Sequence, residues 1–152
     1  MSIESFVNRF NAALDESIRK AMEGPVTTAI KGAMVTAIDK EVFSKYSPSE
    51  YKRRSKSGAP GGLQDWSVME SKYDPSTMTL EVQNMSRDDE SGRLIAPVVE
   101  EGIGYQWEDS RIYAKQPFPR PFHKKAQEIA IQTGNVGAAL RAQLKEDGFD
   151  PK

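Results

Sequence analysis

Acidic side chains form the groups in this chain that come closest to a catalytic or metal-binding pattern. They gather at Asp88-Asp89-Glu90, Glu100-Glu101 and Glu108-Asp109. Carboxylate oxygens bind hard cations, but none of these spacings matches a calcium loop, and short acidic runs are more often solvated turns. A metal-dependent nuclease that uses Asp88, Asp89 and Glu90 is therefore the weakest of three functional interpretations.

Other catalytic and ligand-binding chemistry has little support in the sequence. The chain has no cysteine, which excludes disulfides, thiolate zinc sites and cysteine nucleophiles. Its single histidine, His123, excludes a multi-histidine metal centre within one chain and stands beside Lys124 and Lys125, which favours a solvated side chain. No glycine pattern resembles a phosphate loop. We therefore predict a protein that is not an enzyme and has no metal or cofactor.

A cluster of cations could contact nucleic acid. Lys52, Arg53, Arg54 and Lys56 lie close together in a polar stretch and could bind phosphates with release of counterions. The formal net charge of −1 provides no global attraction to nucleic acid. A soluble loop or a contact with an acidic partner is therefore favoured, and a small nucleic-acid-binding module that uses residues 52–56 is the alternative function.

Residues 1–45 are predicted to be helical, because apolar residues recur at spacings of three and four. Gly24-Pro25 would end a first helix and begin a second, since proline is tolerated at the first helical position but not inside a helix. The alternative is one long helix kinked near Gly24. The apolar positions of the first stripe are Ile3, Phe6, Val7, Phe10, Leu14, Ile18 and Met22.

The middle of the chain is predicted to form a sheet with long loops. Residues 47–62 are predicted to form a flexible basic loop. A hairpin is expected to follow over residues 66–83, with Met78, Leu80 and Val82 on its buried face. The polar run 86–92 is a second loop. Pro97 makes residues 94–99 an edge strand or a short turn, and residues 111–114 could return as a strand.

The C-terminal part, residues 117–148, is predicted to form two helices. Gly134 would end the first, Asn135 would cap the second, and Gly148 would close it. We therefore expect one α+β domain over residues 1–152. It consists of an antiparallel β-sheet (63–115) with a long N-terminal helical region and C-terminal helices packed on it.

Residues 96–122 suggest a surface built for assembly. Three prolines at 117, 119 and 121 fix φ angles around Arg120, whose guanidinium can hold a carboxylate or backbone carbonyls. We expect this cluster to lock the last helices onto the sheet; a merely rigid helix entry is the alternative. Trp107 lies among polar residues, where exposed aromatic side chains often anchor interfaces.

Taken in order, these elements resemble the neck and tail-completion proteins of tailed bacteriophages, the head–tail joining family that includes tail terminators. The first element is Tyr51-Lys52-Arg53-Arg54 followed by Gly61-Gly62-Leu63 and the hairpin. The second is Ala96-Pro97-Val98-Val99-Glu100-Glu101-Gly102, which follows an Ala-Pro-x-Val-Glu-x-Gly pattern. The third is Pro117-Phe118-Pro119-Arg120-Pro121-Phe122, which follows a Pro-Phe-x-Arg-Pro pattern and leads into the last helices. The resemblance covers nearly the whole chain.

The resemblance implies a structural virion protein of the phage neck, assembled in the host cytoplasm. Copies would form a ring, as a hexamer, that joins the head connector or adaptor proteins to the tail tube protein and lets DNA pass without sequence readout. Loops such as 47–62 and 86–93 would order against neighbouring rings. The candidate interface or DNA-channel residues are Lys52, Arg53, Arg54, Lys56, Glu100, Glu101, Trp107 and Arg120.

Overall fold

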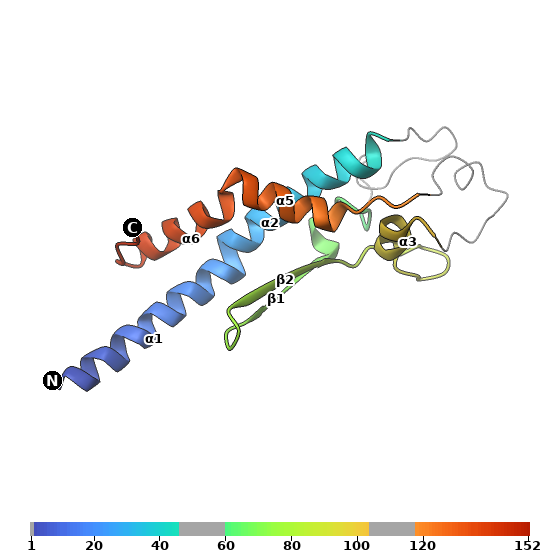
Figure 1. Ribbon diagram of the computed structural model, residues 1–152. Coiled ribbons are helices and arrows are strands. Elements are labelled where there is room, and N and C mark those ends of the chain that lie inside the picture. Colours follow the sequence, from blue (N-terminus) through green and yellow to red (C-terminus); the bar gives the residue numbers. More distant parts are fainter. Residues whose placement is uncertain (1, 46–59, 104–117) are drawn as a thin grey trace.

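The computed structural model describes residues 2–45, 60–103 and 118–152, and its architecture is α+β, as predicted (Figure 1). Long helices form an extended spine, and a β-hairpin and a short helix lie along one side of it. The predicted strand at 111–114 and most of the basic loop lie outside the described residues. The helices are α1 (Ile3–Ala21), α2 (Thr27–Ile38), α3 (Ile95–Glu101), α5 (Phe122–Thr133) and α6 (Asn135–Glu146), and the strands are β1 (Met69–Asp74) and β2 (Thr79–Asn84).

The N-terminal region is one continuous helix rather than two. Between α1 and α2 the chain keeps helical geometry through a π-helical turn, Met22–Val26, and a second π turn, Asp39–Phe43, follows α2. Pro25 lies inside the first π turn, where the widened backbone accommodates a residue that cannot donate a helical hydrogen bond. The Thr27 hydroxyl donates to the Met22 carbonyl at 2.6 Å, so that this carbonyl is satisfied locally. The expectation that Gly24-Pro25 ends the helix is therefore wrong, and its alternative of one long helix holds.

The hairpin pairs β1 with β2 in antiparallel register, with Met69 opposite Asn84 and Tyr73 opposite Leu80. Residues directly opposite each other share a face, and the face with Met69 turns toward the helices. Met69 is buried, and Leu80 and Val82 are half-buried on the same face, as predicted for the latter two. Met78 was expected to be buried with them but is 58% exposed, because it lies in the turn with a φ of 52°.

Residues 95–101 form a helix, which corrects the prediction of an edge strand or turn. Pro97 occupies the third position of α3, in the first turn, where backbone N–H groups have no partner within the helix. Proline is therefore compatible with this helix. The Ile95 N–H, which opens α3, donates instead to the Ser86 carbonyl at 2.8 Å.

The C-terminal helices follow the prediction, except for the cap of α6. Gly134 ends α5 in a left-handed conformation, φ 68°, and Gly148 follows α6 with φ 90°. The N-cap of α6 is Gly134, whereas Asn135 is the first residue of the helix and no side chain caps it. The turn between the helices is too tight to leave Asn135 outside the helix.

The hydrophobic core gathers around α2 and α5. Phe122 at the start of α5 and Ile38 at the end of α2 are both completely buried, and β1 and α3 close the cluster from the side. The core consists of Met34, Ala37, Ile38, Val42, Leu63, Met69, Ala96, Val99, Phe122 and Ala126.

Candidate functional site

The C-terminus of α3 and the entry to α5 meet in a close backbone contact. Gly102 caps α3 in the left-handed region, with φ 68°. A Cβ atom on Gly102 would lie 2.2 Å from the Phe118 carbonyl carbon and 2.5 Å from the Pro119 nitrogen. Only glycine permits both this φ and this approach without strain. The glycine of the Val-Glu-Glu-Gly element and the Phe-Pro step of the proline cluster are therefore packed against each other.

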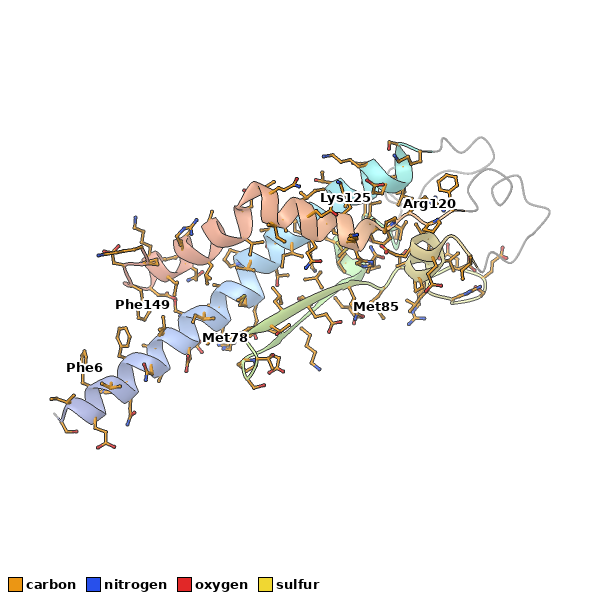
Figure 2. All side chains as sticks on the ribbon, in the orientation of Figure 1. Phe6, Met78, Met85, Arg120, Lys125 and Phe149 are labelled. Carbon is orange, nitrogen blue, oxygen red and sulfur yellow. The ribbon has the colours of Figure 1, made fainter. Side chains whose placement is uncertain are left out.

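Backbone hydrogen bonds continue this contact toward α5. The Arg120 N–H donates to the Val99 carbonyl at 3.1 Å, and the Phe122 N–H donates to the Arg120 carbonyl at 2.8 Å. Arg120 is only 7% exposed, and Figure 2 labels it where the entry to α5 passes α3. These bonds hold the chain so that Phe122 enters the core. The segment that enters α5 is therefore fixed to α3, whereas the expectation was that it would be fixed to the sheet.

Glu100 joins α3 to the first turn of α5. Its Oε1 accepts from the His123 backbone N–H at 2.7 Å and lies 3.0 Å from the His123 Nδ1. The N-cap of α5, Pro121, makes no side-chain capping bond, so Glu100 supplies the missing acceptor from another helix. A carboxylate at a helix N-terminus is also favoured by the helix dipole. We refer to the contacts of Val99, Glu100 and Gly102 with residues 118–123 as the α3–α5 junction.

His123 extends this junction to the sheet. The Asn84 N–H of β2 points at His123 Nε2 at 3.4 Å, so a ring that donates from Nδ1 to Glu100 can accept at Nε2. A histidine held on both nitrogens positions elements and has no ring nitrogen left for a substrate. The expectation of a solvated His123 holds only in part: 35% of its side chain is exposed, but the ring faces α3 and contacts Glu100 and Asn84.

A second set of buried polar contacts lies at the end of β2. The Asn84 side-chain amide donates to the Leu63 carbonyl at 2.6 Å, and the Ser86 hydroxyl donates to the Gly61 carbonyl at 2.6 Å. Asn84 and Ser86 are both buried. Since buried polar groups are costly unless they are hydrogen-bonded, these bonds fix the segment before β1 against the end of β2.

Asp65 stabilises the turn that precedes the hairpin. Its carboxylate accepts from the Gly61 N–H at 2.7 Å and from the Ser67 N–H at 2.9 Å. These bonds, with one from the Ser67 hydroxyl, hold the pKa of Asp65 below its ordinary value. The Asp-x-Ser spacing of Asp65 and Ser67 is the sequence signal for this cap, which was not predicted.

The predicted site residues fall into different environments. Glu100 turns inward to His123, whereas the neighbouring Glu101 is exposed. Asp88 begins a polar turn, accepting from the Ser91 N–H at 2.8 Å, in agreement with the expected loop. Arg120 is buried in the junction. The four cations of the basic loop and Trp107 lie outside the described residues, so their roles stay predictions.

A cavity of about 410 Å³ between β2 and α3 borders the Glu100–His123 pair. A carboxylate–imidazole pair can transfer protons, but no hydroxyl nucleophile is hydrogen-bonded to this histidine in the described ranges. Across those same ranges, no group of three or more acidic or histidine side chains is placed to hold a metal ion. The contacts of Glu100 and His123 link α3, α5 and β2. No described helix is both long enough and apolar enough to cross a membrane.

The chain is an extended α+β protein in which two separate sequence motifs meet at the α3–α5 junction. The family model YomN matches residues 7–146, from α1 to the end of α6, and the chain belongs to this family. It is similar to the SPbeta prophage-derived uncharacterized protein YomN of Bacillus subtilis (strain 168). The two are 29% identical over 134 residues, which cover 88% of this chain and 86% of that protein. No solved structure matches the chain.

Proposed function

We propose that this chain is a structural protein of a phage particle, located at the neck. Copies form a closed ring of about six subunits that joins the head connector to the tail tube and leaves a channel for DNA. The prophage origin of the relative supports a phage role. The finer assignment to the neck rests on the resemblance of the motifs to head–tail joining proteins.

The observation that carries this proposal is the α3–α5 junction. Two short motifs, far apart in the sequence and both part of the resemblance, meet in one backbone contact at Gly102 and Phe118. The junction fixes Gly102 and Phe118, which flank the segment that carries Trp107. An assembly protein needs a rigid base from which such a segment can contact a neighbouring ring. Because the flanking residues are already fixed before binding, less conformational entropy is lost when the segment binds.

The experiment combines the mass of the protein in solution with electron microscopy of its mixture with connector and tail-tube protein. We expect rings, alone or capping a tube. The variant Trp107→Ala should weaken docking, whereas Trp66→Ala, which changes a 44%-exposed tryptophan of the described region, should not. A dispersed monomer that ignores both partners would contradict the proposal and favour the nucleic-acid-binding alternative through residues 52–56.

A further inference from the structure

The free end of α1 carries an apolar stripe that the described part of the chain contacts only at Phe10. Beyond Phe10, which packs edge-on against Phe149 at 5.7 Å, α1 continues past the end of α6 (Figures 1 and 2). The same face further along the helix is buried at Ser17 and Ala21. The stripe consists of Ile3, Phe6, Val7 and Phe10, which are 85%, 59%, 45% and 47% exposed.

An apolar groove of about 740 Å³ opens elsewhere on the same chain. It lies where α2, β2, α5 and α6 meet, and its walls include Ile30, Leu80, Val82, Ala130, Ile131 and Val136. The Arg141 guanidinium reaches over Gly137 at one wall, 3.6 Å from where a Cβ of Gly137 would stand. In the described part of the chain, no carboxylate forms an ion pair with Arg141.

We propose that this groove receives the α1 stripe of a second copy of the chain. A helix that docks in a groove uses anchors at i, i+3, i+4 and i+7, and Ile3, Phe6, Val7 and Phe10 have this spacing. Glu4 borders the stripe on one flank, because residues are 100° apart around a helix. The incoming helix therefore brings the Glu4 carboxylate to the Arg141 wall of a groove whose β2 side carries Glu81.

The α1 stripe cannot reach the groove of its own chain. Ile3 and Ile30 lie on one continuous helix, 27 positions apart, which corresponds to roughly 40 Å along the axis. The contact therefore joins two different patches on two copies, and within a ring it is heterologous rather than reciprocal between two chains. Such a contact repeats from copy to copy and closes into a ring when the rotation allows it. The inference thus rests on the ring in the proposed function and identifies the surfaces that would hold it.

Cross-linking between introduced cysteines tests the contact without background, since the chain has no cysteine of its own. Phe6→Cys and Ile131→Cys are prepared as two chains of different size and mixed under oxidising conditions. We expect a mixed disulfide dimer between them. Phe6→Cys mixed with Met78→Cys is the matched control, because Met78 is also well exposed, at 58% against 74% for Ile131, but lies at the hairpin turn. That pair should not cross-link.

Charge exchange tests the orientation of the incoming helix. Glu4→Arg and Arg141→Glu should each weaken self-association several-fold, and mixing the two variants or combining both changes should restore it. Phe6→Asp should weaken self-association about tenfold or more, as loss of a central anchor does. Circular dichroism checks that each variant remains folded. Single variants that associate like the wild type would overturn the contact.

The outcomes separate this inference from the neck role. Rings on tail tubes with no cross-link between positions 6 and 131 would overturn the contact and leave the neck role intact. Cross-linking between these positions with no binding to connector or tail tube would support the contact and contradict the neck role. A disulfide formed only between two Phe6→Cys chains, or between Phe6→Cys and the tail-tube protein, would show another occupant and overturn the contact.

Discussion

The two ends of the molecule are packed very differently. At one end α2, α3, α5 and β1 enclose fully buried side chains such as Phe122, Ile38 and Met69. At the other end α6 buries no residue fully, and α1 buries only Ser17 and Ala21. Because burial of apolar area dominates folding free energy, we infer that the packed end stabilises the fold. The open end holds apolar side chains that remain available for association.

The same contrast explains why helical periodicity alone is a limited guide. The apolar positions of α1 and of α2 recur with the same spacing, but those of α2 meet α5 and the hairpin, whereas the first turns of α1 extend past α6. A periodic stripe shows which face of a helix avoids water. Whether that face meets its own chain or a partner depends on what lies beside it.

The largest effect should come from the packed end. Phe122→Ala removes a fully buried aromatic ring and should lower the free energy of unfolding by about 3–5 kcal/mol. Phe6→Ala, at the open end, should change it by no more than about 0.5 kcal/mol. Urea denaturation at low protein concentration measures both. Similar losses for the two variants would contradict the comparison.

A pair of glycines tests the α3–α5 junction. Gly102 and Gly134 both cap helices with φ 68°, but only at Gly102 would a Cβ collide with backbone. Gly134→Ala should cost about 1–2 kcal/mol for the left-handed conformation. Gly102→Ala should cost about 1–3 kcal/mol more, because the Phe118-Pro119 backbone must shift. Thermal unfolding compares them, and equal losses would show that the backbone contact is unimportant.

The cap on α5 should make a smaller contribution. Glu100→Gln keeps the size of the side chain but removes the charge that accepts from the His123 N–H and faces the helix N-terminus. We expect a loss of about 1–2 kcal/mol. The exposed neighbour gives the control, since Glu101→Gln should change stability by about 0.5 kcal/mol or less. Calorimetry of both variants would show whether Glu100 acts as the cap.

The smallest effect concerns pH and the turn before the hairpin. Hydrogen bonds from Gly61 and Ser67 hold the pKa of Asp65 below its ordinary value in the folded state. Its contribution is therefore present above the ordinary aspartate pKa and is lost as the pH falls through the folded pKa. Asp65→Asn should lower stability at neutral pH and flatten its decrease in acid. An acid titration of the melting temperature that matches the wild type would exclude this contribution.

Part of the fold could be predicted from local patterns. The helical stretches, the hairpin and the α-helical ends at Gly134 and Gly148 follow from side-chain periodicity and from the conformational freedom of glycine. The helix that contains Pro97 was not predicted, because proline in a first turn and proline in an edge strand leave similar local signals. Likewise, the sequence at Gly24-Pro25 resembles the end of a helix. It forms a π turn because helices continue on both sides of it, which the residues of the turn alone do not show.

The sequence by itself determined that the N-terminal and C-terminal segments are helical, that a hairpin lies between them, and which short motifs stand out. Only the tertiary structure decided that Gly102 packs on Phe118 and that Glu100 caps the helix of His123. These contacts join residues distant along the chain, and local pattern contains no information about such distances. The physical reason is that capping and close approach require a partner in space, whereas periodicity describes only one element at a time.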